Sequence, residues 1–508
     1  MENKESLGKQ ALFGSFWNFI VAIIQRIGGL IFTVILARFL LPEGFGLYNL
    51  VLSVAIIFAM FTQEGIHKSL IRYLSEAIKS KSKDKERDYF KFILKLKIII
   101  LLFFSIAMAV CAYPLAYYIY NKPILFPLLL IGSIYIFAAS LEQFFSSFFF
   151  AVKKIKYVAY KEIIFQVTRL LLVLMLFVWI FKDPSVENAL WILILASIVT
   201  LIYTIYKSYK ILPHLFKGRS QVNKKDKRRI TKFSFFLSIS AISIVFLGNI
   251  DTLMIGLLID DVSYVGFYKA AFILAASVSG LLAFSQVLLP IFVQIKKYRL
   301  EEVFNRSFRY AMLISVPASF GLAVLGNYFL VLLYGHDYLN ATTSLYFLAF
   351  LIVTSIQVGF FTELFSAKER PKEPINLLVG IIVLNIILNF IFIKWFAIYS
   401  LSWAITGASL ATLISWLVYT IGLFYLTKKK LKIKTSVSSI IKPTIASIIM
   451  SILLIYLRNL FGNINIVNGA VLVITGVLVY TLLILLMGGV KKEDYIIIKE
   501  LVNKIKVF

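Results

Sequence analysis

Among the charged residues within long apolar runs of this 508-residue chain, five are the first to explain by their chemistry: Arg26, Glu142, Arg169, Asp251 and Lys269. A charge in such a segment is costly unless it is paired or hydrated. Glu142 and Arg169 are expected at similar depths of consecutive helices, and so are Asp251 and Lys269, because a helix rises about 1.5 Å per residue. Each acid could form a buried ion pair with its base. The alternative is a role of the carboxylates in proton or sodium coupling.

A polar flank on the first apolar run supplies candidate substrate contacts. Asn18 and Gln25 are seven residues apart and share a helix face. Arg26 is offset from that face by about 80°. We interpret Arg26 as a cation that contacts an anionic head group, and a structural ion pair is the alternative.

Two polar residues of later runs join the candidate substrate-binding set. Asn249 belongs to a stripe of small and polar residues from Ser234 to Thr252. Such a stripe either lines a cavity or packs helix against helix. Gln357 falls at the position of Glu142 when the two halves of the chain are aligned.

Few residues are available for metal or covalent chemistry. The single cysteine, Cys111, leaves no basis for a disulfide framework or a cysteine metal site. The three histidines, His67, His214 and His336, are spread over separate loops. No glycine loop of the P-loop type is present, so ATP is not expected to drive the protein directly. The loops predicted outside are short, which argues against an external catalytic domain. We predict no metal, no cofactor and no enzymatic activity.

Composition sets the fold class. Hydrophobic residues make up 60% of the chain and charged residues 15%, whereas soluble domains carry about 25% charged residues. Fourteen apolar runs are long enough to span a bilayer as helices, which predicts an all-α integral membrane protein. The runs are Ala11–Ala37, Phe45–Gln63, Phe92–Ile119, Ile124–Ala151, Tyr157–Phe181, Ala189–Tyr209, Phe233–Ile259, Tyr264–Ile295, Tyr310–Tyr334, Thr342–Ala367, Ile375–Phe396, Leu401–Leu426, Ile440–Leu460 and Ile466–Met487.

The net charge of +28 follows the loops. With the N-terminus placed in the cytoplasm, five of the 53 Lys and Arg fall in outer loops, namely Arg38, Lys122, Lys182, Lys394 and Arg458. Most of the others fall in inner segments, as is typical of short cytoplasmic loops. The charge is therefore a topology signal, and we predict no nucleic-acid partner. The protein is expected to be a multi-pass protein of the cytoplasmic membrane with both termini in the cytoplasm.

The runs and loops predict five regions. Residues 1–210 form an N-terminal six-helix bundle, 211–231 a basic cytoplasmic linker and 232–427 a second six-helix bundle. Residues 428–490 hold two additional transmembrane helices, and 491–508 form an amphipathic cytoplasmic tail. The basic stretch from His67 to Lys97 opens with apolar residues at helical spacing. It predicts an amphipathic helix on the inner leaflet, attracted to anionic membrane lipids.

An internal sequence repeat supports a duplicated architecture. Leu36 to Asn49 reads LARFLLPEGFGLYN, and Gly256 to Lys269 reads GLLIDDVSYVGFYK. Gly46 aligns with Gly266, and each glycine opens an apolar run after a preceding run of similar length. The chain is expected to contain two copies of one membrane-embedded unit.

Several passages together resemble a known family. LARFLLPEGFGLYNL, the passage from Ile250 to Phe272, LYGHDYLNATTSLYFLAF and the run from Leu384 to Ser415 resemble polysaccharide flippases. These are the O-antigen and teichoic-acid type exporters of the multidrug/oligosaccharidyl-lipid/polysaccharide (MOP) superfamily. The resemblance implies a MATE-like fold, with two pseudo-repeated six-helix bundles around a central cavity, two extra C-terminal helices and alternating access. It also implies a cationic contact for pyrophosphate, which Arg26 matches, although few other cations lie inside the spans.

The predicted function follows from that resemblance. It is the movement of polyprenyl-(pyro)phosphate-linked oligosaccharide from the inner to the outer leaflet for cell-surface polysaccharide synthesis, with possible proton or sodium coupling. The expected partners are the lipid-linked oligosaccharide, membrane lipids, and glycosyltransferases or a polymerase of the same pathway. A lipid II flippase is a close variant. A multidrug or metabolite cation antiporter of the same superfamily is the main alternative, kept open by Glu142 and Asp251. A non-transporting envelope scaffold is the third.

Overall fold

The computed structural model describes residues 2–489 apart from 181, 183, 283–287, 289–291, 293, 294, 296, 437, 463 and 464. All regular elements of this described part are helices. The chain forms two compact units. Unit 1 comprises Met1–Ala270 and Leu378–Ala408, and unit 2 comprises Ala271–Leu377 and Ser409–Phe508. The predicted division into two six-helix bundles stays a prediction.

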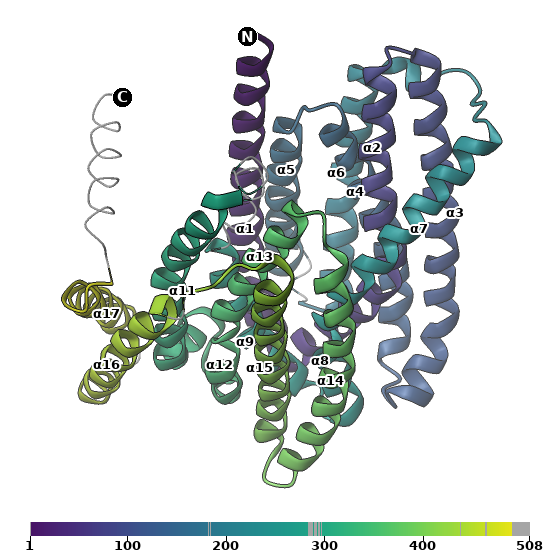
Figure 1. Ribbon diagram of the computed structural model, residues 1–508. Coiled ribbons are helices and arrows are strands. Elements are labelled where there is room, and N and C mark those ends of the chain that lie inside the picture. The colour runs from purple at the N-terminus through teal and green to yellow at the C-terminus, as the bar shows by residue number, and fades with distance from the viewer. Residues whose placement is uncertain are drawn as a thin grey trace. The chain divides into compact units, whose positions relative to one another are not determined.

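Unit 1 holds the first eight long helices and segments of three more (Figure 1). Its long helices are α1 (Glu2–Ala59), α2 (Glu64–Lys79), α3 (Lys83–Pro114), α4 (Leu125–Ala151), α5 (Lys156–Val173), α6 (Val186–Ile211), α7 (Lys224–Leu247) and α8 (Ile250–Leu258). Short 3-10 or π turns are η1 (Met60–Thr62), η2 (Leu115–Ile119), η3 (Leu174–Ile180) and η4 (Pro213–Phe216). The segments belong to α9 (Ser263–Leu281), α14 (Lys372–Ala397) and α15 (Leu401–Leu426).

Unit 2 holds the remainder of α9, α14 and α15 together with the later helices. These are α11 (Lys297–Tyr334), η6 (His336–Ala341), α12 (Thr342–Leu348), α13 (Leu351–Ala367), η7 (Thr427–Leu431), α16 (Ser438–Phe461) and α17 (Ile466–Leu486). A buried apolar cluster that includes Leu325, Tyr328, Met450 and Leu472 packs α11 against α16 and α17.

The first two predicted spans lie in one element, α1, which is two helices joined at a kink. Leu41 at the kink has φ 57° and ψ 175°, far from helical values. Pro42 follows it, and proline both lacks an amide proton and clashes with the preceding helical turn. The predicted turn is thus a kink and not a loop.

The two copies of the turn contact each other in unit 1. A methyl group added at Gly46 would lie 2.2 Å from the carbonyl oxygen of Val262, and one added at Gly266 would lie 2.1 Å from that of Pro42. Pro42 and Val262 each stand four residues before their own glycine. The contact is reciprocal, and only glycine leaves room for it.

Lys122, in the turn between α3 and α4, connects that turn to the end of α8, just before the second copy of the repeated turn. Its Nζ atom donates hydrogen bonds to the carbonyl oxygens of Gly256, at 2.9 Å, and Ile259, at 3.2 Å. Burial lowers the pKa of Lys122, and the carboxylates of Asp260 and Asp261 act in the opposite direction. The lysine therefore satisfies carbonyls at the C-terminal end of α8.

The count of fourteen spans is not confirmed. Among the described residues, 11 helices are long and apolar enough to cross a membrane, or up to 12 if the bent pair His336–Leu348 and Leu351–Ala367 is one span. The predicted run Phe233–Ile259 is divided between α7 and α8 near Asn249. The run Tyr264–Ile295 begins as α9, and most of its later part lies outside the described residues.

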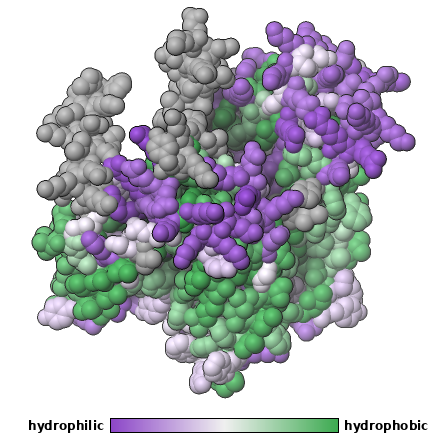
Figure 2. Space-filling model, in the orientation of Figure 1, coloured by the Kyte–Doolittle hydropathy of each residue, from purple (hydrophilic) through white to green (hydrophobic). Residues whose placement is uncertain are grey.

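Lipid-facing surfaces support the membrane assignment. Along α3, Ile99, Phe103, Ile106 and Val110 recur on one face and are 55% to 70% exposed. In unit 1, hydrophilic residues gather over the ends of α2 and α3 and the start of α7, and hydrophobic residues cover the helices beneath (Figure 2). An apolar face of this kind marks a surface that contacts lipid or another protein, and helices long and apolar enough to span a bilayer favour lipid. The chain is a multi-pass membrane protein.

The predicted surface helix after His67 is not supported by its packing. It is α2, and its apolar residues Leu70, Tyr73 and Leu74 are buried against α3, α4 and α7. Tyr73 contacts the ring of Phe233 edge-on at 5.6 Å. The helical spacing was correct, but the apolar face meets protein because α7 covers it. The predicted tail at 491–508 lies outside the described residues.

Candidate functional site

The charged residues of α4 and α5 form one buried chain of polar contacts in unit 1. Nζ of Lys161 lies 3.2 Å from Oε1 of Glu142 and 3.2 Å from Oε2 of Glu162. Gln166 donates to Oε1 of Glu162 at 2.6 Å, and Arg169 donates to Oε1 of Gln166. All five side chains are buried. Two acids and two bases balance in charge, which is how ionic groups persist in a low-dielectric interior.

The predicted direct pair of Glu142 with Arg169 is therefore wrong in detail. The two residues are the ends of the chain, with Lys161, Glu162 and Gln166 between them. Lys161 takes the place opposite Glu142, and the Arg169 guanidinium lies over the ring of Phe32 at 4.3 Å. Similar depth along neighbouring helices favours Arg169 but does not exclude Lys161, which stands near the start of the same run.

Helix α1 approaches α5 closely beside this chain. A methyl group at Gly28 would lie 2.5 Å from Oε1 of Gln166, and one at Gly29 would lie 3.8 Å from Nη2 of Arg169. These two glycines let the amide and guanidinium groups of α5 lie against the backbone of α1. The polar chain thus begins between α4 and α5 and ends at α1.

Asn18, Gln25 and Arg26 are exposed on α1. Arg26 stands two residues before Gly28, so the cation and the buried chain belong to the same stretch of α1. Exposure leaves its guanidinium accessible to an anionic group. The proposed substrate role of these three residues is a prediction that the geometry allows.

A second buried cluster surrounds Asp251 in unit 1. Tyr268 donates to Oδ2 of Asp251 at 2.7 Å, and Asn389 donates to Oδ1 at 2.7 Å. Nδ2 of Asn389 also contacts Oδ1 of Asn385 at 3.2 Å. Lys269 is buried, and the charge of Asp251 acts on it. The structure therefore brings Asp251 and Lys269 into one cluster, and it adds a tyrosine and two asparagines.

The two remaining predicted residues do not join these clusters. Asn249 donates to the carbonyl oxygen of Val245 at 2.9 Å, within its own chain segment. Gln357 belongs to unit 2, where it is buried and its Nε2 lies 3.3 Å from the sulfur of Met312. Their roles in substrate binding stay predictions.

Lys97, like Lys161, is a buried cation that sequence reasoning missed. It is fully buried, and its Nζ donates to the carbonyl oxygen of Thr62 at 2.6 Å and to Oγ of Ser140 at 3.3 Å. Nε2 of His67 lies 3.3 Å away. Thr62 ends η1, where the chain bends between α1 and α2. Lys97 thus satisfies a carbonyl that the bend leaves outside a helix.

Asn385 and Asn389 could have been found from the sequence. They stand four residues apart in an otherwise apolar run, so they share one helix face. Both are fully buried, and amides inside a span need polar partners.

The sequence of residues 11–296 matches the model of a family described as polysaccharide biosynthesis protein. The chain belongs to this polysaccharide biosynthesis family. A similar protein is the probable low-salt glycan biosynthesis flippase Agl15 of Haloferax volcanii, which is 29% identical to this chain over 280 residues. That alignment covers 53% of this chain and 57% of the relative, so the chain matches a little over half of the relative's length.

Solved structures of a flippase and of a multidrug transporter share the fold of this family member. Lipid II flippase MurJ, in an inward closed conformation, matches with a TM-score of 0.75 and 17% identity, over 94% of this chain and 99% of MurJ. An outward-facing multidrug resistance MATE transporter of the MOP superfamily matches with a TM-score of 0.57 and 13% identity, over 84% and 97% of the two chains. At these identities the likeness shows the fold alone.

These comparisons confirm the family and the MATE-like fold predicted from the sequence. The similar proteins are flippases and transporters, in agreement with the prediction that this family member is not an enzyme.

Proposed function

We propose that this chain is a flippase that moves a polyprenyl-phosphate- or pyrophosphate-linked oligosaccharide from the inner to the outer leaflet for cell-surface polysaccharide synthesis. The match of residues 11–296 to the polysaccharide biosynthesis family is the observation that carries the proposal. The similarity to a probable glycan biosynthesis flippase supports it. Glycosyltransferases or a polymerase of the same pathway would supply and consume the lipid, at the cytoplasmic membrane with both termini of the flippase in the cytoplasm.

The physical problem for such a protein is the head group. Phosphate and sugar hydroxyls lose their hydration in the bilayer, whereas a polyprenyl tail does not need water. Arg26 supplies an exposed cation on α1, and a guanidinium binds phosphate by charge-assisted hydrogen bonds. Lys161 and Arg169 balance the charges of Glu142 and Glu162. We therefore assign this chain the positioning of α1, without net charge added to a binding surface.

Alternating access requires a contact that closes one side of the membrane and can be broken. The reciprocal contact of Gly46 with Val262 and of Gly266 with Pro42 meets this need, because it joins the two copies of the repeated turn at backbone distance. On the predicted topology these turns lie outside. We assign them the role of the outer closure in the transport cycle.

The Asp251 cluster is the proposed coupling site. A buried carboxylate beside a lysine, a tyrosine hydroxyl and two asparagines can exchange a proton or hold a monovalent cation. Binding there would change the charge balance at the start of α8, directly after the turn between α7 and α8. This assigns coupling to Asp251 and Lys269, and a positioning role to Glu142 and Arg169.

The second candidate is a cation antiporter. The structural likeness to MATE transporters favours it at the level of fold, and Asp251 offers a buried acid. The exposed charged residue of the candidate set on α1 is nevertheless a cation, Arg26, which attracts anionic and repels cationic substrates.

Binding to the purified protein separates the two candidates. A ligand that binds the folded state raises the unfolding temperature. A polyprenyl-pyrophosphoryl sugar should raise it, and Arg26→Ala should abolish the rise. Arg38→Ala, which removes an exposed cation from the same helix, is the matched control and should keep it. Stabilisation by an organic cation such as tetraphenylphosphonium, without stabilisation by the lipid, would instead establish the antiporter.

A further inference from the structure

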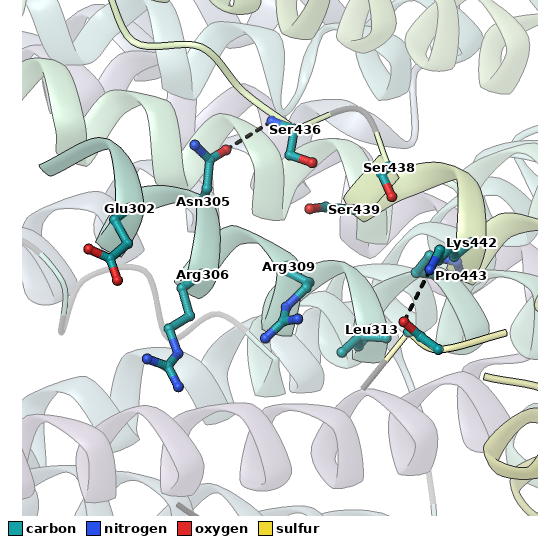
Figure 3. A pocket seen from close by; sticks show the side chains of 12 residues that line it. Glu302, Asn305, Arg306, Arg309, Leu313, Ser436, Ser438, Ser439, Lys442 and Pro443 are labelled. Atoms are coloured by element: carbon teal, nitrogen blue, oxygen red, sulfur yellow. Dashed lines mark hydrogen bonds between the residues drawn. The ribbon is translucent and has the colours of Figure 1, made fainter. Parts of the chain in front are cut away.

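Unit 2 contains a polar cavity of about 340 Å³ that the proposed function does not use (Figure 3). Its walls come from α11, from the start of α16 with the segment before it, and from the two glycines that follow α17. Three of its lining residues are cationic, Arg306, Arg309 and Lys442, and one is acidic, Glu302.

One face of α11 carries the charged wall. Glu302, Arg306, Arg309 and Leu313 follow one another at spacings of four, three and four residues, so they lie on one side of the helix. Figure 3 shows Arg306 and Arg309 as neighbours along that helix. Both guanidinium groups are half-buried. Arg306 donates to the hydroxyl of Tyr310 at 3.1 Å, and Arg309 lies over the same ring at 5.2 Å. Tyr310 thus orients both cations.

The opposite wall adds a third cation and several hydroxyls. Nζ of Lys442 donates to the carbonyl oxygen of Gly488 at 3.1 Å, which joins α16 to the chain after α17. Ser436, Ser438 and Ser439 complete this wall. Ser438 and Ser439 also begin α16, where the first backbone amides have no acceptor within the helix.

We propose that this cavity binds a phosphate group. Two arginines present planar forks of donors that match phosphate oxygens, and a lysine adds a point charge. Serine hydroxyls supply further donors. The lining carries two positive charges more than negative ones, counting Arg306, Arg309 and Lys442 against Glu302. A dianionic phosphate monoester would neutralise that excess.

The phosphate could belong to a lipid or to a soluble anion. An apolar cavity next to the polar one is relevant to this choice. Leu313 lines both this cavity and an apolar cavity of about 450 Å³ enclosed by residues of α9, α11, α16 and α17. Acyl carbons of a lipid whose head group occupied the polar cavity would meet an apolar surface directly beyond it. A soluble phosphate would use the polar cavity alone.

Direct binding to the purified full-length protein tests the proposal. Short-chain phosphatidic acid, short-chain phosphatidylcholine and inorganic phosphate are titrated separately while the unfolding temperature is recorded. Phosphatidic acid should bind, and the double variant R306Q/R309Q should weaken its binding at least about tenfold, as loss of charge-assisted hydrogen bonds does. K429Q/K430Q removes two lysines of η7 that do not line the cavity. It is the matched control and should bind like the wild type.

The results decide whether the cavity binds phosphate and whether that phosphate belongs to a lipid or to a soluble anion. Equal stabilisation by inorganic phosphate, lost in R306Q/R309Q, would support the phosphate site and identify a soluble anion as its ligand. Unchanged phosphatidic acid affinity in R306Q/R309Q and in Lys442→Gln would overturn the proposal. If the double variant does not fold, two milder variants replace it. R306K/R309K keeps both charges but removes the planar guanidinium groups, and Lys442→Gln removes a single charge. The readout needs no transport, so its failure leaves the proposed flippase function untouched.

Discussion

At the scale of single residues, the buried charges of α4 and α5 organise the protein, whereas the exposed Arg26 of α1 is open to a ligand. Glu142, Lys161, Glu162 and Arg169 contact one another, directly or through Gln166, and balance in charge. Arg26 is exposed on the helix against which that chain ends. This division assigns a structural role to the chain and a substrate role to Arg26.

We expect Arg26→Ala to impair flipping while expression and folding are retained, because Arg26 is exposed and lies outside the buried polar chain that packs α5 against α1. Arg26→Lys should recover part of the rate, since it keeps the charge but not the planar fork. Initial rates of lipid movement in proteoliposomes measure both. Wild-type flipping by Arg26→Ala would remove this residue from the site.

We expect Lys161→Met to destabilise the protein by about 3–5 kcal/mol, because it leaves Glu142 and Glu162 buried without their cation. Lys154→Met, at an exposed position of the turn before α5, should be close to neutral. Denaturation of the purified protein in detergent gives both values. Equal stability of the two variants would contradict the buried chain.

The sequence identified these charges but not all their partners. Glu142 and Arg169 were recognisable because they stand in the middle of apolar runs. Lys161 and Lys97 stand near the ends of runs, where a cation is ordinarily hydrated, and only tertiary packing shows that they are buried. Partners across helices depend on rotation and depth, which helical spacing within one run does not determine.

At the scale of elements, the kinked turn of α1 and the repeated turn before α9 pack against each other in unit 1. The two glycines permit a backbone contact that any side chain would prevent. Lys122 joins the turn before α4 to the same place. The repeat was visible in the sequence, and the reciprocal contact was not, because sequence alignment does not say which copies touch.

We expect Gly46→Ala to weaken this closure, since its methyl group would lie 2.2 Å from the carbonyl oxygen of Val262. Val262→Cys in a Cys111→Ser background reports it, because Val262 is buried in the closed contact. A membrane-impermeant maleimide should label this cysteine faster in the Gly46→Ala variant.

Gly380→Ala is the control for that experiment. An added methyl group at Gly380 meets no atom within 4 Å, and alanine is the better helix former. It should leave labelling unchanged. Equal labelling in the Gly46→Ala and Gly380→Ala proteins would argue against a closure at the repeated turn.

Boundaries of elements were less predictable than their existence. The apolar runs located most helices, yet α1 contains two of them, and the run Phe233–Ile259 is divided between α7 and α8. Composition measures how apolar a segment is, whereas kinks depend on single backbone angles such as that of Leu41. The apolar face of α2 was predicted, but not that α7 would cover it.

At the scale of the whole molecule, membership of the polysaccharide biosynthesis family and the MATE-like fold agree with a transporter. The central claim is that this transporter moves a lipid-linked sugar across the bilayer.

The measurement that tests this claim most directly is a transbilayer assay. Purified protein is reconstituted in liposomes that carry a labelled polyprenyl-pyrophosphoryl sugar, and the fraction of label reaching the opposite leaflet is followed with and without a proton or sodium gradient. We predict protein-dependent movement that a gradient accelerates and that Asp251→Asn uncouples from it. Label that stays in its leaflet while an organic cation moves against the gradient would contradict the account.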